Sequence, residues 1–153
     1  MREQIYESKK DKERQRDAMM RICMVLDHLV FEPNERRDNK YPKCDFVLKR
    51  KDNGLIVANA EVKGCKYEYG KFDSVPLALR KAKSLQDQQL YGHIKSLIVF
   101  AYNDKIAYIW LDNLEGKCEW FERKNKRPNN IFDKELVITI PLSKLEVLDE
   151  NKL

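Results

Sequence analysis

Residues that bind transition metals or form disulfides are scarce in this chain of 153 residues. The two histidines, His28 and His93, stand alone, and the four cysteines have neither a C-x-x-C spacing nor a histidine partner. These absences argue against a zinc site and favour reduced thiols, which are typical of intracellular proteins. We expect both histidines to have structural roles.

Long apolar segments are absent as well. No run approaches the roughly 20 apolar residues that a membrane span needs, and the charged residues 1–17 contain no apolar core of a secretory signal. The chain also has no internal repeat. We therefore expect one soluble, cytoplasmic domain over residues 1–153, without membrane contact. Residues 1–12 can form a charged helical extension of it.

Two predicted strands bring three charged residues together. Residues 44–51 and 55–63 have the composition of strands, and the Asp-Asn-Gly sequence between them is typical of a hairpin turn. With a three-residue loop, Asp45 lies directly across from Glu61, and Lys63 points to the same face. A two-residue Asn-Gly turn would instead pair position 45 with position 62. The opposite face is apolar and is expected in the core: Phe46, Leu48, Ile56, Ala58, Ala60 and Val62.

Two carboxylates this close repel each other unless a cation neutralises them. Oxygen ligands from Asp45, Glu61 and the backbone carbonyl of Val62 suit Mg²⁺, with Mn²⁺ as the alternative ion. Such an ion binds phosphate oxygens and activates water, and Lys63 would stabilise the charge that develops on the phosphate. The alternative is a cross-strand ion pair on a solvated sheet face, which contributes little. The apolar character of residues 55–63 argues against that alternative.

Two segments of this chain, Pro42-Lys43-Cys44-Asp45 and Glu61-Val62-Lys63, together resemble the signature of the PD-(D/E)XK nuclease superfamily. One departure is that two residues separate the proline from the aspartate. The order of predicted elements over residues 10–112 is similar to the family's helix, three strands, helix and strand. The resemblance implies an α/β fold with a mixed central sheet flanked by helices, that is, a restriction-endonuclease-like core. It also implies Mg²⁺-dependent cleavage of nucleic acid, with Asp45 and Glu61 as metal ligands and Lys63 as the catalytic lysine.

An acidic residue on the first helix often joins the metal site in this family. Asp17 is the expected candidate and Glu13 the second, although a surface acid paired with a base one turn away is an equal alternative. Members similar to RecB carry a glutamine four residues before a tyrosine on the helix after the lysine. Gln86 and Gln88 do not have this spacing to Tyr91, so a RecB-type exonuclease is not indicated.

The net charge of +5 includes four clusters of basic residues, a distribution that suits a surface following a phosphate backbone. A solvated lysine-rich surface has the same composition, and only the clusters beside the hairpin favour nucleic acid. We expect contacts to nucleic acid from Arg36, Arg37, Lys40, Lys43, Lys66, Arg80, Lys83 and Gln86.

The remaining elements are predicted from periodicity and end signals. We expect helices over residues 8–30 and 74–91, the second with Ser74 as N-cap and Gly92 as its stop. Strands are expected at 97–102, 106–111, 118–121 and 136–140, and a helical turn at 143–148.

Three functions remain open at this point. The leading hypothesis is a Mg²⁺-dependent nuclease acting on DNA, and a homodimer is one way for it to cut both strands. The alternatives are an inactive nucleic-acid-binding module of the same fold and a protein-interaction domain. The sequence does not distinguish DNA from RNA, or cutting within a strand from cutting at an end.

Overall fold

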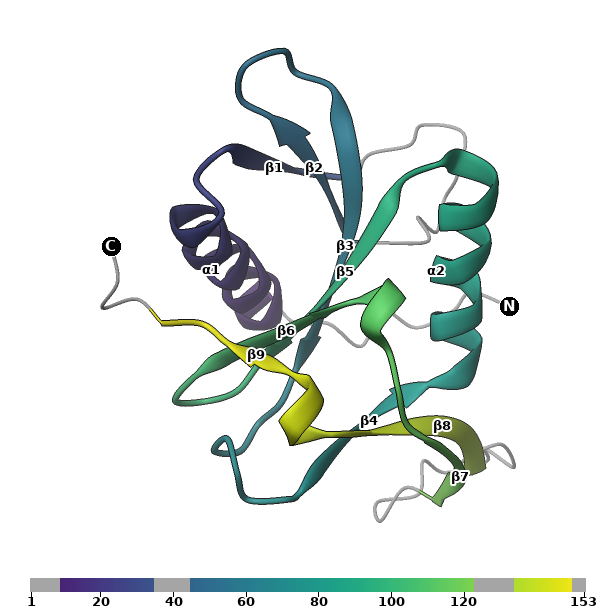
Figure 1. Cartoon of the computed structure of the whole chain (residues 1–153). Coiled ribbons are helices and arrows are strands. Elements are labelled where there is room, and N and C mark those ends of the chain that lie inside the picture. Colours follow the sequence, from purple (N-terminus) through teal and green to yellow (C-terminus); the bar gives the residue numbers. More distant parts are fainter. Residues whose placement is uncertain (1–8, 35–44, 123–133, 150–153) are drawn as a thin grey trace.

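The computed structural model describes residues 9–34, 45–122 and 134–149. Its centre is a mixed six-stranded sheet of order β1-β2-β3-β5-β6-β9 (Figure 1). Neighbouring strands are antiparallel except β3 and β5, which are parallel. The strands are β1 (Leu29–Pro33), β2 (Phe46–Arg50), β3 (Ile56–Gly64), β5 (Lys95–Ala101), β6 (Ile106–Trp110) and β9 (Glu146–Val147).

The parallel pair needs a crossover connection. Strand β4 (Ser74–Ala78) and helix α2 (Leu79–Gly92) provide it between β3 and β5. Strand β4 also belongs to a second, three-stranded antiparallel sheet of order β4-β8-β7, with β7 at Lys117–Glu122 and β8 at Lys134–Pro141. Two short 3-10 helices, η1 (Leu111–Asn113) and η2 (Leu142–Lys144), follow β6 and β8.

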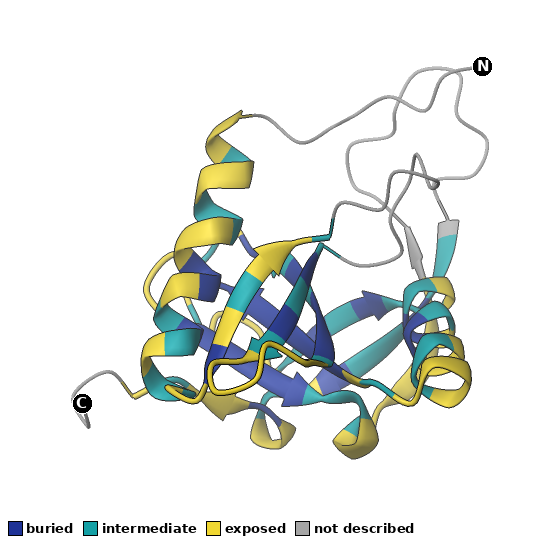
Figure 2. Cartoon of the chain, turned by 90° about the horizontal axis from the view of Figure 1, so that it is seen from above, coloured by how far each residue is buried: buried dark blue, intermediate teal, exposed yellow. Residues whose placement is uncertain are grey.

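Helices cover both faces of the main sheet, with α1 (Lys9–Val25) on one side and α2 on the other (Figure 1). Figure 2 shows the buried strands between them. Successive residues of β5 point alternately to the two faces, as a strand requires: Leu97 and Val99 belong to the core under α1, Ile98 and Phe100 to the core under α2. This strand is buried on both sides, which confirms the expectation of a central strand.

The first helix is shorter than predicted, because it ends at Val25 and the chain continues as β1. The prediction of one helix over residues 8–30 was therefore wrong at its end. Leu29 is buried and Pro33 lies opposite Phe46, on an edge strand where a proline is tolerated. The apolar face of the helix runs directly into an apolar strand, so periodicity gave no sign of the boundary.

The second helix begins later than predicted. Residues from Ser74 to Ala78 form β4, in which Val75 and Leu77 are buried and pair with β8. Pro76 is again on an edge strand. At the other end the stop is His93 rather than the predicted Gly92: His93 has the left-handed φ of 56°, and its N–H donates to the Gln89 carbonyl.

The other predicted strands are confirmed with small shifts of their ends, while the helical turn expected at 143–148 is η2 followed by β9. Within the described part of the chain, no helix is both long and apolar enough to span a membrane.

Candidate active site

The register of the β2–β3 hairpin is the one expected for a three-residue loop. Phe46 pairs with Ala60 and Leu48 with Ala58, so Asp45 and Glu61 are the residues that follow the last pair of the ladder. The loop itself is longer than predicted. The two carboxylate-bearing residues therefore stand at the same end of the hairpin, Asp45 directly before β2 and Glu61 within β3.

The turn has four residues, 51–54, rather than three. Arg50 donates its N–H to the Leu55 carbonyl, and Gly54 takes a positive φ of 70° that favours glycine. A bulge after Leu48 then shifts the pairing by one residue. The bulge restores the predicted register, and it also leaves Ile56 exposed, although Ile56 was expected in the core.

The Asp45 carboxylate is held against the backbone of β3. Its Oδ2 accepts a hydrogen bond from the Val62 N–H at 2.9 Å. The Asp45 carbonyl accepts another from the Asn34 N–H at 3.1 Å, next to the end of β1. The paired part of β2 ends at Phe46, so the Asp45 side chain supplies the acceptor that a further ladder residue would have supplied. Asp45 thus lies beside the backbone that joins Glu61 to Lys63.

Asn59, Glu61 and Lys63 alternate with core residues along β3, and we call them the polar face of β3. Asn59 donates to the Gln88 Oε1 of α2 at 2.9 Å. Glu61 pairs with an α2 lysine, and Lys63 with a β4 carbonyl. The polar face of β3 is therefore covered by α2 and β4, unlike the solvated sheet face of the ion-pair alternative.

Glu61 is close to a cation. The Nζ of Lys81 lies 3.1 Å from its Oε1, and the exposed fraction of the side chain is 13% for Glu61 and 35% for Lys81. A carboxylate so far removed from water needs opposite charge nearby. The Lys81 ammonium therefore occupies the position beside the Glu61 carboxylate.

Lys63 is held at the end of β3 by a hydrogen bond from its Nζ to the Pro76 carbonyl of β4. Burial lowers the pKa of Lys63 below its usual 10.5, while the nearby Cys65 and Glu135 act in the opposite direction. Burial disfavours the charged form of a lysine because the ammonium loses its hydration. Lys63 is therefore an ammonium that gives up its proton more readily than a surface lysine does.

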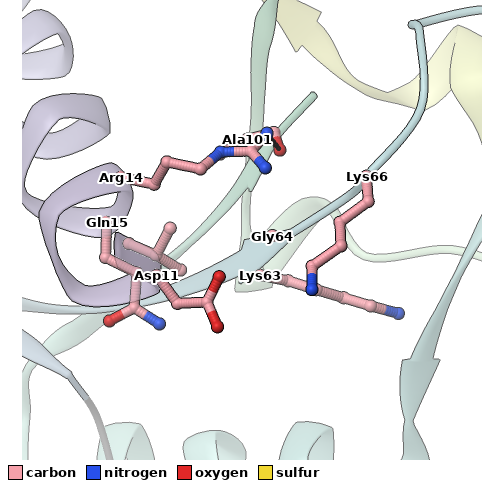
Figure 3. A pocket seen from close by; sticks show the side chains of 8 residues that line it. Asp11, Arg14, Gln15, Lys63, Gly64, Lys66 and Ala101 are labelled. Atoms are coloured by element: carbon pink, nitrogen blue, oxygen red, sulfur yellow. Dashed lines mark hydrogen bonds between the residues drawn. The ribbon is translucent and has the colours of Figure 1, made fainter. Parts of the chain in front are cut away.

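A cavity of about 280 Å³ opens between α1 and the end of β3, and we call it the α1 cavity. Asp11 and Arg14 of α1 line it together with Lys63 and Lys66 (Figure 3). Arg14 extends to the end of β5, where it donates to the Ala101 carbonyl at 3.3 Å, and also to Asn103. The cavity therefore combines one carboxylate with three cationic side chains.

Asp17 lies elsewhere on α1. Its side chain is 66% exposed and faces Arg21 at 3.9 Å, and Glu13 is exposed as well. Asp11, by contrast, is seven residues before the buried Ala18, so the two share one face of the helix at about two turns. The interval of seven residues between Asp11 and the buried Ala18 is the signal in the sequence that would have pointed to Asp11.

The predicted nucleic-acid contacts are partly described. Lys66 lies at the α1 cavity, and Lys83 and Gln86 are exposed on α2. Arg80 is also exposed and pairs with Glu135 at 3.0 Å. The expected contacts of Arg36, Arg37, Lys40 and Lys43 lie outside the described residues. Four residues that reach the site were not predicted from the sequence: Asp11, Arg14, Lys81 and Gln88.

The donor set fits a hard divalent ion. Among the residues that the structure describes, no three His, Cys, Asp or Glu side chains are grouped as a metal site. Mg²⁺ nevertheless needs only one or two carboxylates, because it keeps several waters and takes further oxygens from a substrate. Asp45, Glu61 and the Val62 carbonyl supply oxygen donors of this kind, and the ammonium beside Glu61 marks a place for a cation.

Known proteins resemble this chain at the level of the fold. No family model and no curated protein sequence matches the chain. A solved nuclease structure from a fusselovirus matches with a TM-score of 0.54 and 14% identity, over 94% of this chain and 90% of that one. A Holliday junction resolvase from the archaeal hyperthermophile Archaeoglobus fulgidus matches with a TM-score of 0.49 and 11% identity, over 87% and 97%. The likeness to the viral nuclease structure, together with the order of elements described above, confirms the predicted restriction-endonuclease-like fold.

Proposed function

We propose that this chain is a metal-dependent nuclease that hydrolyses phosphodiester bonds, with DNA as the first substrate to test. The observation that carries the proposal is the end of the β2–β3 hairpin. There, Asp45 directly precedes β2, Glu61 lies on the neighbouring β3, and Lys63 shares the covered face with Glu61. This arrangement occurs in a fold that a known nuclease also has.

Mg²⁺ is the ion we assign to Asp45, Glu61 and the Val62 carbonyl, with Mn²⁺ as the alternative. The ion, when bound, lowers the pKa of water and offsets charge on phosphate. We assign the acidic position of the first helix to Asp11 in preference to Asp17. Its place in the α1 cavity beside Val62 and Lys63 supports this assignment.

Lys63 is the residue we assign to the reacting phosphate. Its Nζ donates one hydrogen bond to the Pro76 carbonyl, which fixes its direction and leaves further N–H groups to donate. A buried ammonium stabilises developing phosphate charge more strongly than one in water does. Its lowered pKa also makes Nζ a better proton donor.

Substrate binding is assigned to the cationic side chains around this site. Arg14 and Lys66 line the α1 cavity next to Lys63, so they suit a neighbouring phosphate of the same strand. Arg80, Lys83 and Gln86 would extend the contacts along α2, and Arg36, Arg37, Lys40 and Lys43 those before the hairpin. The described part of the chain carries one such site, so we propose a homodimer for substrates cut on both strands.

A second candidate is a nucleic-acid-binding module of this fold that does not cut. The ion pair between Lys81 and Glu61 favours it, because an ammonium already neutralises the carboxylate that the metal would need. In this candidate the lysine replaces the ion permanently.

The test is incubation of the purified chain with linear, circular and branched DNA and with RNA, each in Mg²⁺, Mn²⁺ or EDTA. Cleavage that depends on the ion supports the nuclease. Binding without cleavage under every condition supports the inactive module. The substrate that is cut fastest identifies the preferred nucleic acid, and loss of circular DNA shows that cutting occurs within a strand.

A further inference from the structure

We propose that Lys81 is a built-in counter-ion of Glu61 which the metal has to displace, so that Lys81 sets the affinity of the site for the ion. The inference rests on the proposed function. It differs from the inactive-module candidate because the ammonium gives way instead of remaining.

The Glu61 carboxylate is the more buried partner of the pair. Its side chain is 13% exposed, and the Lys81 Nζ lies 3.1 Å from its Oε1. Leaving such a carboxylate uncompensated is strongly unfavourable, whereas an ammonium at this distance offsets the lost hydration. The fold without metal is therefore stabilised by Lys81 at the place where the ion would act.

Lys81 is directed to this place by its position on α2. It is seven residues, about two turns, from Gln88 on the same face of the helix. Gln88 in turn is bonded to Asn59, which is two residues before Glu61 on the same face of β3. The two contacts join one face of α2 to the polar face of β3, so the Asn59–Gln88 bond helps to hold α2 where Lys81 lies beside Glu61.

The other described cationic side chains near Glu61 do not lie beside its carboxylate. Arg80 is 84% exposed in its side chain and pairs with Glu135, and Lys83 is exposed. Lys63 donates to the Pro76 carbonyl. Lys81 is thus the cation of α2 that competes with a metal ion for Glu61.

Displacement is physically feasible because lysine is long and flexible and Lys81 is 35% exposed, so its ammonium can move into water. The ion must replace the attraction between Lys81 and Glu61. Removing the ammonium while keeping the length of the side chain should therefore tighten binding of the ion, on the order of tenfold for a pair of this partial burial.

The test is a calorimetric titration of the chelator-treated full chain with Mn²⁺, which needs no substrate. Lys81→Met should bind Mn²⁺ on the order of tenfold more tightly than the wild type. Lys81→Arg, which keeps the charge, and Lys105→Met, at an exposed lysine that has no part in the proposed site, should keep the wild-type affinity. If the wild type binds Mn²⁺ and Lys81→Met binds it equally or more weakly, the inference is wrong while the proposed metal site stands. If neither binds, the metal site itself is wrong.

Thermal melts give a second readout that a merely structural lysine would not produce. Without metal, Lys81→Met should melt below the wild type, because Glu61 loses its counter-charge. Saturating Mn²⁺ should narrow or close that gap, since tighter binding stabilises the folded state more. An equal gap with and without Mn²⁺ would contradict the inference.

Discussion

Each side chain on the polar face of β3 has a partner from a different part of the chain: Asn59 with Gln88, Glu61 with Lys81 and Lys63 with Pro76. The acidic and basic residues of the hairpin could be found from the sequence, because one local turn brings them together. Asp11 and Lys81 could not be found in the same way. Their positions depend on how α1 and α2 rotate as they pack on the sheet.

Asp45 has a structural role that can be separated from the chemical role proposed for it. Its carboxylate accepts the Val62 N–H, which an asparagine oxygen can still do and an alanine cannot. We expect Asp45→Ala to lose about 1–3 kcal/mol in the free energy of unfolding and Asp45→Asn to lose less. Both should lose cleavage. Urea unfolding of the two variants measures the difference, and equal stabilities would contradict the hydrogen bond.

Lys63 should make stability depend on pH. Its pKa is lowered in the folded state, so the unfolded chain binds more protons, and stability rises as pH increases from the folded pKa towards 10.5. The wild type should therefore gain stability relative to Lys63→Met over this range. Denaturant unfolding at several alkaline pH values checks this, with Lys83→Met as the matched control. A wild type that loses stability relative to Lys63→Met would contradict the burial of the ammonium.

Strands whose residues are continuously apolar, or alternate between apolar and polar, could be predicted from the sequence. The boundaries between a helix and an adjoining strand could not. Ser74 and Pro76 are typical of a helix start, yet the tertiary pairing of Val75 with Ile140 makes the segment a strand. The helix after it begins at Leu79 without a side-chain cap. Pairing with β8, which lies some sixty residues later, is not visible in the local pattern.

This assignment of β4 predicts the outcome of two substitutions. Ser74→Ala should change the free energy of unfolding by no more than about 0.5 kcal/mol, because Ser74 caps no helix. Val75→Ala should cost about 2 kcal/mol, because Val75 is fully buried. Chemical denaturation of both variants gives the comparison. A loss of about 1 kcal/mol or more at Ser74 alone would indicate an N-cap.

For the molecule as a whole, positive charge is the property that would attract a nucleic-acid partner. The net charge is +5, and Arg14 and Lys66 are grouped at the α1 cavity. The affinity for nucleic acid should fall steeply as salt rises, because phosphate contacts release counter-ions. Charge reversal at Arg36 and Arg37 should weaken binding for all sequences alike. Fluorescence anisotropy over a salt series measures both effects. An affinity independent of salt would favour the protein-interaction domain.

The most direct test of the proposed function is the cleavage rate of Lys63→Ala in Mg²⁺, beside the wild type and Lys66→Ala. Lys63→Ala should cut at no detectable rate and still bind nucleic acid, because the surface cations are unchanged. Lys66→Ala should cut with a weaker affinity for the substrate. Cleavage by Lys63→Ala at the wild-type rate, with contaminating nuclease excluded, would contradict the assignment of Lys63 and of the site around it.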